Sequence, residues 1–343
     1  MSMPPLVFRF HDIAQVEIES GSAFVRAFFE AEYGYHRADR PQTGLPRVLV
    51  DFQLGSARPP GFTSHVHKLL ARWGYRLTIE PGEFGIHVYG NRMAVSMAHH
   101  MLVHPSLRWL AAGRGTTLLL HAGAVVKNGK SLIFTGKGGA GKTTTTSLVL
   151  AAGADWQLHA DDYVFLGNGQ SLAYVTRSHL YRDLLKWVPE ISARLTIWER
   201  IRLEFFGAIR KYSGERLKWA VRLGPERLWP GKTIAETATP AAILLLERAE
   251  VSSPELIPVT DLPGTASDLL EMNFGEARHF LTLLQKAGSL DEQWLADWKT
   301  SEHALLLKIL AETPAYRLVL PFSQSARDVK ATLLPLLDKL VRA

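Results

Sequence analysis

The strongest constraint on the fold is a glycine-rich segment near the middle of the chain, GKGGAGKT at positions 136–143. It fits the pattern G-x-x-x-x-G-K-[ST] at every fixed position, and this pattern connects a β-strand to an α-helix around a bound phosphate. The flanking residues agree, because 132–134 is a short apolar run and 144–150 contains no Gly or Pro. These residues predict a strand–loop–helix unit of an α/β fold.

The composition of the loop also predicts its chemistry. Glycines let successive backbone N–H groups point into one concavity that holds an anion, and the helix that follows adds its dipole. Lys142 would reach the β- and γ-phosphates of a nucleoside triphosphate, and the Thr143 hydroxyl would ligate Mg²⁺. We therefore predict ATP and Mg²⁺ as ligands. The expected nucleotide-binding residues are Gly136, Lys137, Gly138, Gly139, Ala140, Gly141, Lys142, Thr143 and Thr144.

Length and composition limit the remaining possibilities. A chain of 343 residues with 47% apolar and 21% charged residues is typical of a globular protein with one large or two moderate domains. The absence of cysteine excludes disulfides and thiolate metal sites and fits a reducing compartment. The N-terminus does not resemble a signal peptide, and no apolar run approaches the length of a membrane span. We expect a cytoplasmic protein without a membrane partner.

The predicted elements divide the chain into two parts. Residues 1–112 are expected to form a small, strand-rich α+β domain, and residues 113–343 to form the nucleotide-binding domain. In the first part, Pro81-Gly82 should turn one strand back on the next, and in the second part Asn128-Gly129 should do the same. The expected strands include 48–52, 75–80, 85–89, 116–120, 241–247 and 316–320, and the expected helices include 23–33, 63–73, 267–284, 293–310 and 325–340.

Two adjacent carboxylates follow the loop at a distance in sequence that a helix and a strand can span. Asp161 and Asp162 lie nineteen and twenty residues after Lys142, so a helix followed by a strand can return them to the phosphate site. One carboxylate there could hold Mg²⁺ while the other accepts a proton from an attacking hydroxyl. His121, at an expected strand end before the loop, could orient one carboxylate or contact a phosphate. The sequence leaves open which Asp has which role.

These motifs, in the order HAGA at 121–124, GKGGAGKT and HADDYV at 159–164, resemble the catalytic domain of HPr kinase/phosphorylase and its related kinases. The resemblance covers residues 115–167, and 238–248 is similar to a later core strand. It implies a P-loop fold like the nucleotide-binding domain of phosphoenolpyruvate carboxykinase. It also implies transfer of the γ-phosphoryl group of ATP to a serine hydroxyl. Asp161 and Asp162 would then supply the metal contact and the general base, and His121 would pair with them.

The chain lacks the E-x-R-G signature that follows the acidic pair in HPr kinases, so the resemblance does not identify the acceptor. A protein or peptide serine and a small serine-like metabolite both remain open. Acceptor-binding elements are expected in 177–232, which carries thirteen Lys and Arg against six Asp and Glu and is expected to be largely helical. There Arg227 and Lys232 are candidates for stabilising the transferred phosphate, and most tryptophans should be packing anchors. Related kinases often assemble, so a homo-oligomer is possible.

Two other functions compete with the kinase. The segment KGGAGKTT at 137–144 also fits the deviant loop of partition and septum-positioning ATPases, in which the first lysine, here Lys137, reaches across a dimer interface. That class begins with the loop, carries a D-x-x-P switch and lacks the acidic pair, and the chain differs on each point. The second alternative is a nucleotide sensor that binds nucleic acid through the tryptophan-bearing basic segment.

Overall fold

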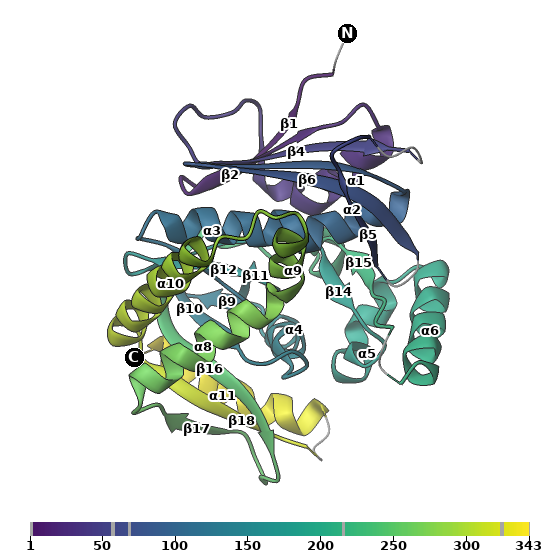
Figure 1. Cartoon of the computed structure of the whole chain (residues 1–343). Helices are drawn as coiled ribbons and strands as arrows, with labels where there is room; N and C mark the ends of the chain where they lie inside the picture. The colour runs from purple at the N-terminus through teal and green to yellow at the C-terminus, as the bar shows by residue number, and fades with distance from the viewer. Residues whose placement is uncertain (1–2, 56–58, 68–69, 215–216, 323–325, 343) are drawn as a thin grey trace. The chain divides into compact units, whose positions relative to one another are not determined.

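The computed structural model describes residues 3–55, 59–67, 70–214, 217–322 and 326–342. Its mixed helices and strands confirm the α/β class (Figure 1). The chain forms two compact units: Met1–Leu119 with Ala266–Lys308, and Leu120–Thr265 with Ile309–Ala343. This division differs from the expected boundary after residue 112, because a helical stretch of the C-terminal half packs with the N-terminal unit. None of the helices in the described ranges is long and apolar enough to span a membrane.

The first unit is built on a seven-stranded mixed sheet. The hairpin predicted around Pro81-Gly82 is confirmed, since β6 and β7 pair antiparallel and Gly82 adopts a φ of 76°. The helix expected over 63–73 is wrong, because 63–67 form β5 and 71–73 begin β6, and these two strands pair antiparallel. Residues 68–69 of that range lie outside the described residues. The sheet order is β3 (Arg37–Ala38), β1 (Leu6–Phe10), β2 (Ala14–Glu19), β4 (Arg47–Leu54), β7 (Glu83–Gly90), β6 (Ala71–Glu80) and β5 (Thr63–His67).

Helices cover one face of this sheet (Figure 1). The first is α1 (Ala23–Tyr33), which matches the predicted range and begins at the N-cap Ser22. A continuous helical stretch follows the sheet and contains a π-helical turn. Its parts are α2 (Arg92–Ala98), η2 (His99–Val103) and α3 (His104–Gly113), and the later helices are α8 (Leu262–Glu276), α9 (Arg278–Lys286) and α10 (Glu292–Glu312).

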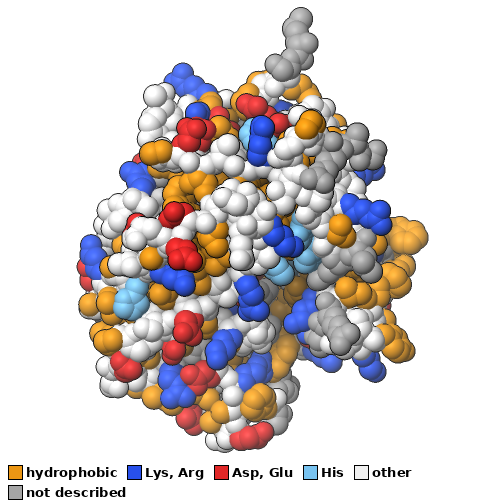
Figure 2. Space-filling model, viewed as in Figure 1, with side chains coloured by type: hydrophobic (Ala, Val, Ile, Leu, Met, Phe, Trp, Pro, Cys, Tyr) orange, Lys and Arg blue, Asp and Glu red, His pale blue; other side chains and the backbone are white. Residues whose placement is uncertain are grey.

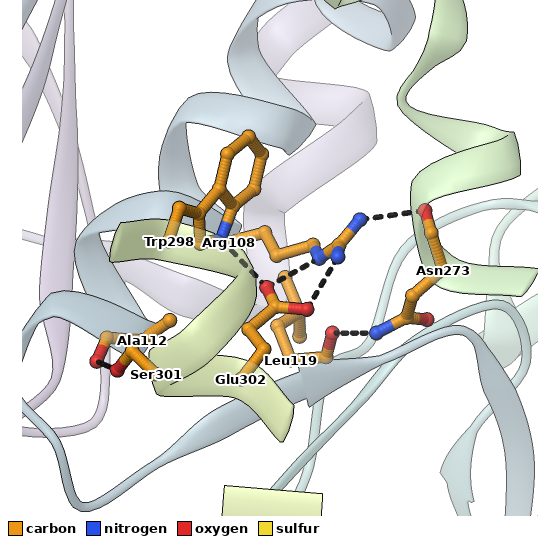
Figure 3. Close-up of polar contacts among 7 residues, drawn as sticks. All are labelled: Arg108, Ala112, Leu119, Asn273, Trp298, Ser301 and Glu302. Carbon is orange, nitrogen blue, oxygen red and sulfur yellow. Dashed lines mark hydrogen bonds and ion pairs between the residues drawn. The ribbon is translucent and has the colours of Figure 1, made fainter. Parts of the chain in front are cut away.

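A buried ion pair joins the later helices to α3, as Figure 3 shows. The guanidinium of Arg108 donates through Nε to Glu302 at 2.6 Å and through NH1 to the carbonyl of Asn273 at 2.6 Å. The indole of Trp298 donates to the same carboxylate at 2.7 Å. Both charged side chains are almost completely buried. Their pairing explains why 266–308 belongs to the first unit despite its position in the sequence.

The second unit is built on another mixed sheet, with the long strand β16 at its centre. β10 and β18 pair with β16 in parallel, and β9 and β10 form the predicted hairpin. Its turn residues Asn128 and Gly129 have φ values of 54° and 73°, as a type I′ turn requires. The order is β11 (Gln157–Ala160), β9 (Ala122–Lys127), β10 (Lys130–Thr135), β16 (Thr237–Ala249), β13 (Gln170–Leu172) and β12 (Val164–Gly167), with β18 (Ala315–Pro321) beside β16 and β17 (Glu255–Pro258) beside β18; β8 (Leu118–Leu120) spans the unit boundary.

Two helices pack on this sheet and on each other. They are α4 (Lys142–Ala152) and α11 (Ala326–Arg342), and both contact β10. Their apolar side chains share one core with the sheet, in which Phe134 of β10, Leu148 of α4 and Leu337 of α11 are almost inaccessible to solvent. This core fixes the N-terminus of α4 relative to the strand ends around it.

The basic segment 177–232 is less helical than expected. Only α6, with sixteen residues, is a long helix there among the residues that can be described. Trp229 is buried and Trp187 and Trp219 are half-buried, as predicted for packing anchors, but Trp198 is exposed. The elements are β14 (Ser178–Leu180), α5 (Leu184–Trp187), η3 (Pro189–Arg194), α6 (Ile197–Tyr212), β15 (Val221–Leu223) and α7 (Pro225–Leu228).

The buried pair of the first unit gives a stability prediction. We expect Glu302→Ala to lower the free energy of unfolding by about 3–5 kcal/mol, because it leaves a buried guanidinium without its carboxylate. The exposed pair of Glu30 and Arg37 provides the control, and Glu30→Ala should cost less than about 1 kcal/mol. Urea denaturation followed by circular dichroism measures both. Equal midpoints for the two variants would contradict the role assigned to Arg108 and Glu302.

Candidate nucleotide-binding site

The phosphate loop connects the end of β10 to the start of α4, as predicted. Gly136 and Gly141, the two glycines fixed by the motif, adopt φ values of 150° and 106°, which side-chain-bearing residues rarely adopt. A Cβ atom on Gly136 would also lie 3.1 Å from the carbonyl oxygen of Leu246 on β16. Glycine at these two positions therefore lets the chain leave the sheet and turn into the helix.

Lys142 lies at the first position of α4 and is largely buried. Its Nζ donates to the carbonyl oxygen of Gly136 at 2.8 Å, so the side chain folds back over the loop. This holds a positive charge where the N–H groups at the helix N-terminus also point. The loop, the ammonium group and the helix end together form a strongly anion-attracting position.

Asp161 follows β11 and reaches the same place. Its carboxyl group hydrogen-bonds with the side chains of Thr143 and Ser178. Burial, followed by the neighbouring charge of Asp162, raises the pKa of Asp161 to about 7. The two hydrogen bonds and the charge of Lys142 act in the opposite direction but do not compensate. The predicted return of the acidic pair to the loop is therefore observed for Asp161.

Asp162 faces His121, the third predicted member of the site. The Nε2 atom of His121 lies 3.1 Å from Oδ1 of Asp162. Two further contacts hold the histidine: the backbone N–H of Ala122 donates to the carbonyl of Asp162 at 3.0 Å, and the imidazole packs on the ring of Tyr163. A histidine so held can fix the orientation of the Asp162 carboxylate.

A buried polar network connects the strands that precede the phosphate loop and the acidic pair. The Nδ1 atom of His159 donates to the carbonyl of Ala235 at 2.6 Å, and its Nε2 lies 3.0 Å from Oγ of Ser171. The Ser171 hydroxyl lies 2.8 Å from that of Ser131 on β10. His159 is completely buried, so it supports the strands below the acidic pair and does not contact the ligand position.

Close packing of α4 on β9 brings the loop to the acidic pair. A Cβ atom on Gly123 would lie 2.4 Å from Oγ1 of Thr146 and 3.3 Å from the backbone oxygen of Asp161. Only a glycine lets the helix approach the strand so closely. Gly123 belongs to the HAGA element at 121–124, but the motif by itself does not predict this packing role.

Arg248 is a site residue that the sequence analysis missed. One of its terminal nitrogens lies 3.6 Å from the position that a Cβ atom on Gly141 would occupy. The guanidinium also lies over the ring of Trp187, with its central carbon 5.0 Å from the ring centroid, and burial lowers its pKa. The sequence signal that could have identified Arg248 is its position near the end of an apolar run that forms β16. Parallel neighbours such as β10 and β16 end at the same sheet edge, so a residue at the end of β16 lies near the loop that follows β10.

Arg227 and Lys232, predicted to contact transferred phosphate, are not brought to the loop. Arg227 forms a two-pronged ion pair with Glu199, with distances of 2.7 and 2.9 Å. Lys232 donates to the carbonyls of Gly153 and Ala154. These carbonyls lie beyond the C-terminus of α4, about 16 Å from its phosphate end at 1.5 Å per residue. Charge and position in the sequence do not show where these side chains lie, and both form their contacts away from the loop.

Other residues of the basic segment do lie near the acidic pair. Ser178 of β14 contacts Asp161, and three residues farther on is Tyr181. Burial, followed by the charge of Asp162, raises the pKa of Tyr181, whereas Arg210 and Arg222 lower it. The β14–β15 ribbon therefore brings the phenol of Tyr181 and the guanidinium of Arg222 to the acidic side of the site, and Arg210 of α6 lies over the Tyr181 ring.

The donor set fits Mg²⁺. The Thr143 hydroxyl and the Asp161 carboxylate are hard oxygen ligands close enough to share a hydrogen bond. Within the described residues no group of three His, Cys, Asp or Glu could hold a metal ion by itself. Mg²⁺ at phosphate loops takes few protein ligands and completes its shell with nucleotide oxygens and water, so these two donors suffice.

The raised pKa of Asp161 predicts a pH-dependent stability in the absence of Mg²⁺ and nucleotide. The folded chain keeps this carboxyl protonated up to about pH 7, whereas the unfolded chain ionises it near 3.8. The contribution to stability therefore falls as the pH rises from about 4 to 7, and stays constant above that. We expect Asp161→Asn to raise Tm at pH 8 by at least about 2–4 °C, the shift that 1 kcal/mol produces in a domain of this size.

Calorimetry at pH 5 and pH 8 measures this effect, and the gain should be smaller at pH 5. Asp155→Asn is the matched control, because Asp155 lies nearby in sequence and its side chain is 77% exposed. The assignment would be contradicted if Asp161→Asn gave the same shift at both pH values, or if Asp155→Asn reproduced it.

No protein-family model matches the chain, and no curated protein sequence is significantly similar to it. What the site does must therefore be inferred from its own side chains.

Proposed function

We propose that the chain is an ATP-dependent kinase that transfers the γ-phosphoryl group to a hydroxyl. The acceptor would be a serine of a protein or peptide, or a small serine-like metabolite. The observation that carries the proposal is the contact of Asp161 with Thr143 of the phosphate loop, beside Asp162, which pairs with His121. An HPr kinase-related core with a phosphoenolpyruvate carboxykinase-like fold is the finer structural proposal.

The loop supports binding of the triphosphate. On binding, the Lys142 ammonium would exchange the carbonyl of Gly136 for phosphate oxygens, and the loop N–H groups would donate to the same anion. Arg248, beside Gly141, would contact the phosphate chain from the β16 side. Mg²⁺ held by Thr143 and Asp161 would neutralise charge on the β- and γ-phosphates.

The two carboxylates differ in surroundings, which supports different roles. Asp161 faces Thr143 and would hold the metal, whereas Asp162 is oriented by His121 and would be the base. In the reaction the acceptor oxygen forms a bond to the γ-phosphorus and its proton passes to Asp162. The bond between the γ-phosphorus and the β–γ bridging oxygen breaks, and ADP leaves.

The acceptor would enter from the side of the basic segment. Ser178 of this segment hydrogen-bonds to Asp161. The charges of Arg210 and Arg222 lower the pKa of Tyr181, and the charge of Asp162 raises it. The two guanidinium groups that act on Tyr181, of which Arg210 also pairs with Asp183, would favour an acceptor that carries negative charge close to its hydroxyl. This supports acceptor binding by 177–232 through residues other than Arg227 and Lys232.

Nucleotide binding and turnover can be separated by two substitutions. We expect Lys142→Ala to weaken ATP binding strongly, because it removes the charge at the β- and γ-phosphates. Asp162→Asn should keep ATP affinity within about threefold but lower phosphoryl transfer by about 10²–10⁴-fold, the contribution of a general base. Calorimetric titration with MgATP and ADP release measure the two quantities, and Asp155→Asn is the control for a nearby exposed carboxylate. Normal turnover by Asp162→Asn would contradict the assignment.

Two loop-side cations separate the kinase from a dimerising ATPase. In a kinase, Lys137→Ala should have little effect, because Lys137 is exposed and the main contacts come from the loop backbone and Lys142. Arg248→Ala should lower turnover by about 10²–10³-fold if its guanidinium stabilises developing charge. A large loss in Lys137→Ala together with failed dimerisation would instead favour the partition-type ATPase.

A further inference from the structure

Helix α6 exposes most of its large apolar side chains to solvent and buries little of its surface in the protein. Leu203 is its one buried residue, and the opposite face carries five large apolar side chains. At 100° per residue, positions 198, 201, 205 and 212 fall in one narrow stripe along the helix, and position 197 widens it at the N-terminal end. The apolar stripe consists of Ile197, Trp198, Ile201, Phe205 and Tyr212.

The members of the apolar stripe are strongly exposed. Trp198 and Tyr212 have 72% and 89% of their surface accessible, and the other three are at least half exposed. Figure 2 shows these apolar atoms gathered over α6, at the right of the view. Single exposed apolar residues are normal, but a contiguous row of five indicates a surface that binds a protein or a membrane.

The acidic groups of α6 are already neutralised within the chain. Glu199 forms the two-pronged pair with Arg227, and Glu204 pairs with Arg182 at 3.1 Å. The carboxylates next to the apolar stripe therefore do not leave a net negative charge at this surface.

Three of the four basic groups of α6 keep their charge, whereas Arg210 pairs with Asp183 at 3.2 Å. Arg200 and Lys211 are exposed and project beside the stripe on one side, and within the described ranges neither forms an ion pair. Arg202 lies on the other side, over the ring of Phe206. The stripe is thus bordered by positive charge on both sides, within a segment that carries a surplus of Lys and Arg.

We propose that α6 docks on a phospholipid bilayer surface with anionic headgroups, with the helix axis in the plane of the interface. An apolar face of Trp, Phe and Ile bordered by Arg and Lys is the pattern of an interfacial amphipathic helix. Trp198 and Tyr212 lie near the two ends, about 21 Å apart at 1.5 Å per residue, and these residue types favour the headgroup region. Long basic side chains beside them can reach lipid phosphates.

Charge argues against the other occupants. Two copies of the chain that met through α6 would bring two positively charged segments together, which costs energy. An acidic protein would satisfy the charge, but a convex helix ridge needs a matching groove, whereas a fluid lipid surface adapts to it. The proposal adds a surface contact to a chain whose described helices do not span a membrane, and it revises the expectation of no membrane partner.

Co-sedimentation of the full chain with vesicles tests the proposal. We expect binding to vesicles of phosphatidylcholine mixed with phosphatidylglycerol, no comparable binding to phosphatidylcholine alone, and release at high salt. The double variant Ile201→Ser/Phe205→Ser should weaken binding by more than about tenfold, because two buried apolar side chains are lost. Met93→Ser on α2 removes an equally exposed apolar side chain and should leave binding unchanged.

A second variant separates charge from apolar contact. Arg200→Gln/Lys211→Gln should weaken binding to anionic vesicles and reduce its salt dependence. Unaltered far-ultraviolet circular dichroism and Tm show that each variant is folded, as expected for exposed positions. The proposal is overturned if the native chain fails to sediment with anionic vesicles or binds both compositions equally. A dimer in light scattering that Ile201→Ser/Phe205→Ser dissociates, or an acidic protein that binds α6 in place of vesicles, would also overturn it.

Discussion

The candidate site depends most on the antiparallel pairing of β9 with both of its neighbours. The first residue of β9, Ala122, lies opposite Thr135, the last residue of β10 before the loop. On the other side, Ala124 lies opposite Ala160, the last residue of β11 before the acidic pair. The start of one strand and the ends of two others therefore meet at one sheet edge, and His121, the loop and Asp161 follow from that register.

The energetic consequence of this convergence is a crowded, charged and partly buried site. Two adjacent carboxylates and a lysine are held by backbone geometry, and the pKa of Asp161 is raised because burial outweighs its favourable contacts. Folding thus tolerates an unfavourable arrangement that a cation and a nucleotide would relieve, since bound Mg²⁺ favours the ionised carboxylate. Perturbed pKa values of this kind are common at sites where groups are positioned for chemistry.

Much of this arrangement could be predicted because its signals are local. The loop, the Asn128-Gly129 hairpin and the distance from Lys142 to the acidic pair each depend on a few neighbouring residues. The error at 63–73 has a different origin, since a short stretch of mixed polarity does not distinguish a helix from an edge strand until its partner β6 is known. The π-helical turn at His99–Val103 likewise has no clear sequence signal.

Long-range contacts were the part that sequence could not supply. Arg248 is beside the loop only because β16 pairs in parallel with β10 and extends past it. Lys232 has the right charge, but it binds the far end of α4, and Arg108 and Glu302 are 194 residues apart in the chain. Trp198 reads as a core residue by type, and only the orientation of α6 shows that it faces outward.

The most direct test of the proposed kinase activity is to measure which molecule receives the γ-phosphoryl group of ATP. The native chain is incubated with γ-labelled ATP and Mg²⁺, with a panel of serine peptides, folded proteins and hydroxyl-bearing metabolites. We predict label in an acid-stable phosphate ester on one class of acceptor, with little release as inorganic phosphate when that acceptor is present. Label found only as inorganic phosphate, whatever acceptor is offered, would contradict a kinase and leave a hydrolytic nucleotide switch.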